Sequence, residues 1–340
     1  MSGPGTEPGA PAAVVAGLGG LLPRRVLTND DLAAELDTTD EWIRTRTGIS
    51  SRHVVDPGTA TGDLATGAAR RALDSAGLST VDSVVLATST PDRSCPATAP
   101  EVASRLGVTG PALDVGAVCT GFVYALATAA GFLATGIGTT AVVIGADVFS
   151  TILDPTDRTT RAIFGDGAGA VVLRRGTADE PGALRGFDLG SDGSGADLIA
   201  VPGGGSRQRS SGAVSDPYFR MQGREVFREA VLRMSESAAT TLHRAGWKPA
   251  ELDALVAHQA NQRILAAVGE QLGVGPERIP SNLDRVGNTV AASIPLALAD
   301  FVARERVRPG DRVVLTGFGG GLTWGSVALR WPDVALTAVP

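Results

Sequence analysis

Few residues in this chain are of a type that supports covalent chemistry, and Cys119 is the most informative of them. It lies in Asp114-Val-Gly-Ala-Val-Cys119-Thr-Gly-Phe122, where small residues precede a long apolar run. The pattern predicts a cysteine at a helix start, where unpaired N–H groups and partial positive charge favour a thiolate nucleophile. The alternative is a buried cysteine that packs as a small hydrophobic residue.

Two polar residues stand at comparable boundaries, His258 and Asn288. His258 ends the apolar run Leu255-Val-Ala before a predicted helix, which is where α/β sheets present ligand-binding groups. Asn288 follows a glycine and precedes another apolar run. The simpler alternatives are a histidine whose hydrogen bonds are satisfied in the core and an asparagine that caps a helix.

The elements that would position these residues occur twice. Three pairs of similar segments recur in the same order at an offset of about 166–171 residues: 72–87 with 241–257, 104–108 with 270–274, and 141–145 with 312–316. A period this long indicates domain duplication, although recurrence by composition is the alternative. Cys119 and Asn288, 169 residues apart, would take corresponding places and meet in one cleft.

Helices alternate with apolar runs such as 84–88 and 313–316, which predicts an α/β fold with mostly parallel or mixed sheets. We expect two halves, residues 13–180 and 181–340. Residues 1–12 are rich in Gly, Pro and Ala, and we predict a disordered tail there instead of a signal peptide.

Composition narrows the class of protein. The 340 residues are 43% hydrophobic and 19% charged, with a net charge of −6, which fits a globular enzyme and argues against a nucleic-acid surface. The two cysteines form no C-x-x-C pair, so a reducing cytoplasm is expected. No Cys, His or carboxylate cluster has metal-ligand spacing, and Gly317–Gly321 lacks the lysine of a phosphate-binding loop.

Several motifs occur together and in order from about Val14 onward. They are Asp40-Glu-Trp42-Ile-Arg44-Thr-Arg46-Thr-Gly48, the Cys119 segment, Phe164-Gly-Asp-Gly-Ala-Gly169, His258-Gln-Ala-Asn261, Gly287-Asn288-Thr and Gly319-Gly-Gly321-Leu-Thr-Trp324-Gly. In this combination the chain resembles the β-ketoacyl-ACP synthase III family of the thiolase-like superfamily.

The resemblance implies a five-layer αβαβα fold, a homodimer and a catalytic trio. By similarity, Cys119 is the acyl-accepting nucleophile, with His258 and Asn288 as its partners. The backbone N–H groups of Cys119 and Gly320 would form the oxyanion hole.

The resemblance also implies binding residues. Trp42, Arg46 and Arg158 match positions that hold the nucleotide end of coenzyme A. Arg228 and Arg263 match basic positions that receive acyl carrier protein.

Cys95 falls where family members place a residue that reaches across the dimer into the partner's acyl pocket. Its small side chain would leave room for a longer or branched primer, as in an enzyme that starts a polyketide or a specialised lipid. The alternative is a cysteine that serves only in packing.

The implied reaction is decarboxylative condensation of an acyl-CoA primer with malonyl-ACP through an acyl-cysteine, which initiates fatty-acid or polyketide synthesis. It needs no metal or redox cofactor, and no nucleic acid or membrane is expected as a partner. The alternative is an acyltransferase of the same fold that moves the acyl group to an alcohol, an amine or a carrier protein without decarboxylation. An acidic residue at position 288 would have favoured that alternative.

Overall fold

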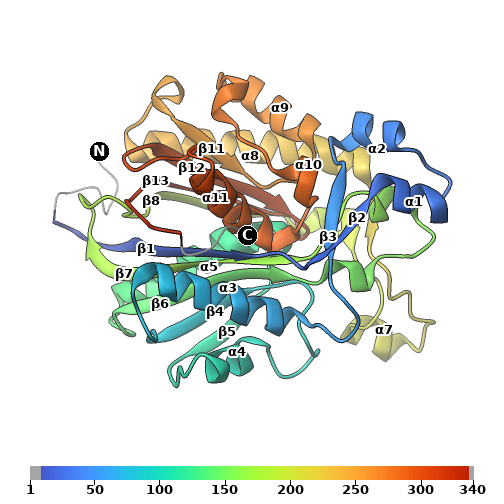
Figure 1. Cartoon of the computed structure of the whole chain (residues 1–340), viewed down its shortest axis with the longest axis horizontal. Helices are drawn as coiled ribbons and strands as arrows, with labels where there is room; N and C mark the ends of the chain where they lie inside the picture. Colours follow the sequence, from blue (N-terminus) through green and yellow to red (C-terminus); the bar gives the residue numbers. More distant parts are fainter. Residues whose placement is uncertain (1–8, 337–340) are drawn as a thin grey trace.

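Two mixed β-sheets form the frame of the molecule in the computed structural model, which describes residues 9–336 (Figure 1). The first sheet has the order β1 (Pro11–Leu21), β7 (Gly167–Thr177), β6 (Thr140–Asp147), β4 (Ser83–Ala87), β5 (Ala112–Val115). The second has the order β11 (Ala254–Ala257), β12 (Arg312–Gly319), β13 (Thr323–Arg330), β8 (Arg185–Ser191). Within these two sheets β4 pairs in parallel with β5 and β6, and β11 with β12, while the other pairs are antiparallel.

Helices complete five layers. Helices α5 (Gly121–Ala134) and α11 (Ser293–Ala303) lie between the sheets, α3 (Thr61–Ala76) and α4 (Ala99–Arg105) cover the first sheet, and α8 (Gly223–Ala245) and α9 (Gln262–Leu272) cover the second (Figure 1). Because α5 contains no charged residue, it suits a position between two sheets. The predicted αβαβα architecture is confirmed.

Shorter elements complete the chain around this frame. They are β2 (Arg25–Thr28), α1 (Asn29–Glu35), α2 (Asp40–Thr47), β3 (Ser51–Val54), α6 (Arg158–Arg161), β9 (Ile199–Ala200), α7 (Ser206–Ser211), β10 (Arg220–Met221) and α10 (Leu283–Val286). In Figure 1 α1, α2, β2 and β3 lie together at one end of the molecule. None of the helices within residues 9–336 is long and apolar enough to cross a membrane.

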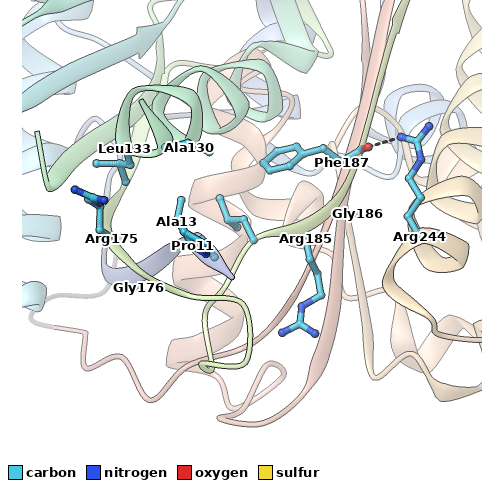
Figure 2. A pocket seen from close by; sticks show the side chains of 13 residues that line it. Pro11, Ala13, Ala130, Leu133, Arg175, Gly176, Arg185, Gly186, Phe187 and Arg244 are labelled. Carbon is cyan, nitrogen blue, oxygen red and sulfur yellow. Dashed lines mark hydrogen bonds between the residues drawn. The ribbon is translucent and has the colours of Figure 1, made fainter. Parts of the chain in front are cut away.

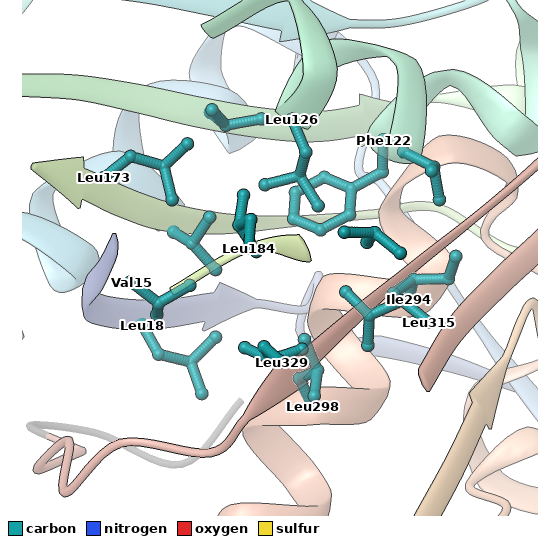
Figure 3. Packing of buried hydrophobic residues seen from close by; sticks show 14 of the residues in the cluster. Val15, Leu18, Phe122, Leu126, Leu173, Leu184, Ile294, Leu298, Leu315 and Leu329 are labelled. Carbon is teal, nitrogen blue, oxygen red and sulfur yellow. The ribbon is translucent and has the colours of Figure 1, made fainter. Parts of the chain in front are cut away.

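The largest core cluster fills the space between the sheets (Figure 3). Its side chains come from α5, α11 and both sheets, and include Val15, Leu18, Phe122, Leu126, Leu173, Leu184, Ile294, Leu298, Leu315 and Leu329. Each fully buried side chain of this kind contributes about 1.5–3 kcal/mol to folding. The packing therefore holds α5 and α11 against both sheets.

The internal repeat is visible in the helix ends and the strand starts. Helices α3 and α8 end at Gly77 (φ 66°) and Gly246 (φ 71°), in the left-handed region that favours glycine. Strands β6 and β12 begin at residues 140 and 312, and α5 and α11 at 121 and 293, an offset of 172 in both cases. At this offset Cys119 corresponds to Ala291, so the expected correspondence between Cys119 and Asn288 is wrong by three residues.

The start of the described chain also corrects an expectation. Residues 1–12 were predicted to be a disordered tail, but Pro11 and Ala12 already belong to β1 and pair with Thr177 and Gly176 of β7. Backbone pairing to a neighbouring strand outweighs the low propensity of this Gly/Pro/Ala-rich sequence. The first eight residues lie outside the described part of the chain, and the division into halves at residue 180 stays a prediction.

Candidate active site

Cys119, His258 and Asn288 line the same cavity, which has a volume of about 160 Å³. They come from three distant segments of the chain, before α5, after β11 and after α10. Their exposed fractions are 9%, 2% and 4%, so all three side chains are withdrawn from bulk water. The structure thus brings together the three residues singled out in the sequence.

Cys119 lies in a 3-10 turn, η1 (Val118–Thr120), that leads directly into α5. Burial raises the pKa of the thiol far above its ordinary value, and the neighbouring Asp147 carboxylate raises it further. The expected stabilisation of a thiolate by the helix start is therefore outweighed, and the resting cysteine is a thiol. A nucleophile in this setting needs a base to take its proton.

His258 directly follows β11, and its backbone N–H donates to the Thr316 carbonyl at 2.8 Å. Burial lowers the pKa of the imidazole to about 3, so the ring is neutral at physiological pH. Its buried Nδ1 atom has no hydrogen-bond partner among the described residues. A neutral imidazole has one nitrogen that donates and one that accepts, which suits proton transfer and hydrogen bonding to a bound group.

Asn288 is held by its own backbone and by one side-chain contact. Its N–H donates to Ile163 O and its carbonyl accepts from Gly165 N–H, both at 2.9 Å. Its Oδ1 accepts from Val290 N–H at 2.9 Å. Since Oδ1 faces the turn, the amide Nδ2, which has no partner within residues 9–336, remains able to donate.

A second cavity, of about 430 Å³, adjoins the first. Gly320 lines it, with Thr88 and Ser89. Four side chains line both cavities: Val118, Phe149, Ile199 and Phe219. Cys119 therefore lies close to two spaces, one with His258 and Asn288 and one with Gly320.

Three phenylalanines form an aromatic cluster against Cys119. The ring centroids of Phe149, Phe164 and Phe219 lie 4.7–5.1 Å apart. Only Phe164 belongs to a motif noted in the sequence. Phe149 and Phe219 are far apart in the chain, and no local pattern relates them.

The three residues expected at the nucleotide end of coenzyme A form another cluster, around α2. The guanidinium groups of Arg46 and Arg158 lie 4.5 and 5.0 Å from the ring centre of Trp42. Asn261, which lines the smaller cavity, donates from its side chain to Arg46 O at 2.9 Å. The cluster is therefore tied to the rim of that cavity.

Comparisons with known proteins give the family. Residues 113–193 match the model for 3-oxoacyl-[acyl-carrier-protein (ACP)] synthase III, and residues 242–331 match the model for its C-terminal part. A β-ketoacyl-[acyl-carrier-protein] synthase III of Streptomyces coelicolor is 59% identical over 95% of this chain and 98% of the relative. The chain belongs to the β-ketoacyl-ACP synthase III family. It is accordingly an acyltransferase of the ketosynthase type, as the sequence motifs predicted.

Solved structures of family members have the same fold. The 3-oxoacyl-(acyl carrier protein) synthase III of Pseudomonas aeruginosa PAO1 has a TM-score of 0.91 and 56% identity, over 95% of this chain and 99% of that one. The priming β-ketosynthase from the R1128 polyketide pathway has a TM-score of 0.89 and 34% identity, over 97% and 99%. An enzyme of a polyketide pathway is thus among the structures that are similar to this ketosynthase.

The remaining predicted site residues lie outside the two cavities. Arg228 on α8 and Arg263 on α9 are exposed, and the Arg263 guanidinium lies 5.8 Å from the ring centre of Phe227, which lines the smaller cavity. Cys95 is an exposed free thiol in the segment between β4 and α4 and lines neither cavity of its own chain.

One residue near the site was missed in the sequence. Asp147 ends β6, is fully buried and accepts hydrogen bonds from four donors. Burial raises the pKa of this carboxyl to about 7, while amide donors act in the opposite direction. The signal was an acid directly after the apolar run 141–146, at the sheet edge where functional groups gather.

A larger cavity, of about 560 Å³, shares no lining residue with these two (Figure 2). Arg175, Arg185 and Arg244 line it together with small apolar side chains such as Ala13 and Leu133. It contains no cysteine, histidine or carboxylate, so it offers neither a nucleophile nor a base. In the described part of the chain no group of three or more His, Cys, Asp or Glu is placed to hold a metal ion.

Proposed function

We propose that Cys119 takes an acyl group from acyl-CoA and that acyl-Cys119 then condenses with malonyl-ACP, with loss of carbon dioxide. The supporting observation is that a buried cysteine, a neutral histidine and an asparagine with a free amide nitrogen line one cavity. Splitting the condensation at a covalent thioester replaces one difficult step by two easier ones.

In the loading step the Cys119 sulfur attacks the thioester carbonyl while its proton passes to the neutral imidazole of His258. The new S–C bond forms as the bond to the CoA sulfur breaks, and that sulfur leaves with the proton. Negative charge develops on the carbonyl oxygen, and the N–H groups of Cys119 and Gly320 would stabilise it. One such donor contributes roughly 3–4 kcal/mol.

In the condensation step malonyl-ACP loses carbon dioxide, and the electron pair moves toward its thioester oxygen. His258 and the amide nitrogen of Asn288 donate hydrogen bonds to that oxygen. The resulting carbanion attacks the acyl carbon as the bond to the Cys119 sulfur breaks. Cys119 leaves as a thiolate, which takes up a proton from solvent to restore the resting thiol. The Asn288 amide is suited to this role because its oxygen is already engaged with Val290 N–H. The proposed reaction includes no metal or redox cofactor.

Two outer clusters would bind the carriers. The stacked side chains of Trp42, Arg46 and Arg158 suit an adenine ring and phosphates, since arginine pairs with phosphate and tryptophan stacks on bases. The exposed Arg228 and Arg263 near the rim suit an acidic carrier protein.

We also propose a homodimer. Strand β5 is the edge of the first sheet, and its residues are only half-buried, Leu113 and Val115 among them. An unpaired edge of this kind can pair with a second copy of itself. In that dimer Cys95 would act, if at all, on the partner's acyl space, because it lines neither cavity of its own chain.

Both cysteines are unpaired, as a thiol nucleophile requires, which favours the cytoplasm as the compartment.

The test is intact-protein mass spectrometry after incubation with a panel of acyl-CoAs, followed by malonyl-ACP. Wild type should gain the acyl mass and then lose it with release of carbon dioxide. Cys119→Ala should gain no mass, and His258→Ala should be slowed in both steps because its imidazole serves both. Asn288→Ala should fail mainly in the second step. Discharge of the acyl group to another acceptor without carbon dioxide would instead support the simple acyltransferase.

A further inference from the structure

The duplicated fold contains two turns of the same kind, and only one of them carries Cys119. The turn η1 precedes α5, and η6 (Val290–Ala292) precedes α11 at the same offset of 172 residues. Each begins with a valine in the left-handed region, Val118 at φ 46° and Val290 at φ 54°. Because valine rarely adopts this conformation, its presence at both places marks them as equivalent. Ala291 is the counterpart of Cys119.

Each turn lies against the end of a strand from the other half. A Cβ added at Gly145 of β6 would lie 2.2 Å from Ala291 O, and one added at Gly317 of β12 would lie 3.5 Å from Cys119 O. The strand residues that follow by two positions are Asp147 and Gly319. Asp147 and Gly319 therefore occupy equivalent positions, Asp147 beside the η6 turn and Gly319 beside the η1 turn.

At the η6 turn the strand end supplies a carboxylate. Asp147 Oδ2 accepts from Ala291 N–H at 3.0 Å. Its Oδ1 accepts from Ser89 N–H at 2.7 Å and from the hydroxyls of Thr88 and Thr90 at 3.2 and 3.1 Å. All four neighbours donate, which is the environment of a carboxylate.

At the η1 turn the strand end supplies no side chain. A Cβ added at Gly319 would lie 2.8 Å from Cys119 N and 3.1 Å from Thr120 N. The backbone of the η1 turn therefore packs directly against Gly319, and this strand end supplies no side-chain acceptor to Cys119 N–H, whereas Asp147 supplies one to Ala291 N–H.

We propose that Asp147 is a positioning residue: its carboxyl group occupies the counterpart of the oxyanion site and thereby fixes the turn that follows Asn288. The link to Asn288 runs through two adjacent backbone amides, because Ala291 N–H is held by Asp147 while Val290 N–H is held by Asn288 Oδ1. The inference rests on the proposed function, in which the Asn288 amide serves the condensation step.

The carboxylate does not assist the nucleophile. A negative charge beside Cys119 opposes formation of the thiolate. Removal of that charge should leave acyl loading intact or faster. If Asp147 positions Asn288, the same change should slow condensation. The rates of the two half-reactions therefore separate the proposal from a general loss of structure.

The decisive variant is Asp147→Asn, which keeps the shape of the side chain. One amide oxygen cannot accept from both Ser89 N–H and Ala291 N–H, which approach opposite oxygens of the carboxylate. We expect loading with acyl-CoA to stay within about twofold of wild type, and condensation with malonyl-ACP to fall at least about tenfold. An equal fall in both rates, or no fall in condensation, would overturn the proposal.

Asp82→Asn is the matched control. The Asp82 carboxylate also accepts four hydrogen bonds, from the N–H and hydroxyl groups of Thr139 and Thr140, but at the opposite end of β6. The Asp82→Asn variant should leave the ratio of the condensation rate to the loading rate unchanged. If wild type itself forms no acyl-enzyme, the proposed function fails first, and the two failures are distinguishable.

If Asp147→Asn does not fold, Thr90→Val provides the second test. It removes one of the four donors to Asp147, together with the acceptor of Val148 N–H, and leaves the link to Ala291 in place. We expect the ratio of condensation to loading to fall again, by a smaller factor. An unchanged ratio in a folded Thr90→Val enzyme would contradict the proposal.

Discussion

The ends of β6 and β12 are the same place in the two halves of the molecule, yet one carries Asp147 and the other Gly319. The neighbouring strands differ in the opposite sense, with a small residue in the first half and a polar one in the second. Ala87 of β4 pairs with Gly145, whereas His258 donates its backbone N–H to Thr316 O, the acceptor beside Gly317. The two halves have similar backbones at this point, but the strand end supplies a side-chain acceptor to Ala291 N–H and none to Cys119 N–H.

The strongest test of this difference is Gly319→Ala. The added Cβ would lie 2.8 Å from Cys119 N and 3.0 Å from Ala117 O, and both are backbone atoms that cannot turn away. Loss of one oxyanion donor lowers a rate by about 10²–10³. We expect acyl loading to fall by this factor, measured as the rate of mass gain on Cys119.

Gly131→Ala is the control for Gly319→Ala. Gly131 lies on α5, and a Cβ added there has no neighbour within 4 Å. This variant should load at the wild-type rate and be more stable by up to about 1 kcal/mol. A normal loading rate in Gly319→Ala would mean that a Cβ next to Cys119 N–H does not impair this group as an oxyanion donor.

Gly→Ala substitutions at two equivalent positions test how closely each turn packs against its strand, through their effect on the free energy of unfolding. Gly145→Ala places a Cβ 2.2 Å from Ala291 O, whereas Gly317→Ala, at the equivalent position, places one 3.5 Å from Cys119 O. Overpacking of this kind costs about 1–3 kcal/mol, so Gly145→Ala should lower the free energy of unfolding by at least that amount. Gly317→Ala should change it by less than about 0.5 kcal/mol. Equal effects in urea denaturation would show that the two turns are packed alike.

The presence of His258 in the second half, where the first half has Ala87, can be tested by the pH dependence of stability. Because burial lowers the pKa of His258 from 6.5 to about 3, the unfolded chain binds a proton between these values and the folded chain does not. Stability from this group is therefore full above pH 6.5 and is lost as pH falls, by up to about 1.4 kcal/mol per pH unit.

The measurement is the free energy of unfolding at pH 7, 6 and 5 for wild type and His258→Asn. The variant should lose less stability on acidification. His243→Asn, at an exposed position on α8, should follow wild type. Parallel curves for wild type and His258→Asn would contradict a buried, neutral imidazole.

The smallest expected effect concerns the wall that the two cavities share. Phe219 packs edge-on against Phe149 and Phe164, with centroids 5.0 and 5.1 Å away. Phe219→Leu should widen the space beside Cys119 and shift the preferred acyl-CoA toward longer chains by about tenfold, in competition experiments read by mass spectrometry. An unchanged preference would place the determinant elsewhere, for example at Cys95.

Much of this protein was determined by sequence alone. The apolar runs fixed the alternation of helices and buried strands, because both periodicities are local. The order of motifs around Cys119, His258 and Asn288 was specific enough to indicate the family. Even the duplication was visible, since a helix end at Ala-Gly is a local signal for a left-handed cap.

Only the tertiary structure decided the electrostatics and the pairing of the two halves. A local rule predicted a thiolate at Cys119, but the pKa of a buried group depends on every segment that excludes water from it. Likewise Asp147 and Ala291 are 144 residues apart, and their hydrogen bond exists because β6 packs against the turn of the other half. Sequence determines which residues are available for chemistry, whereas burial and long-range contacts determine their charge and their partners.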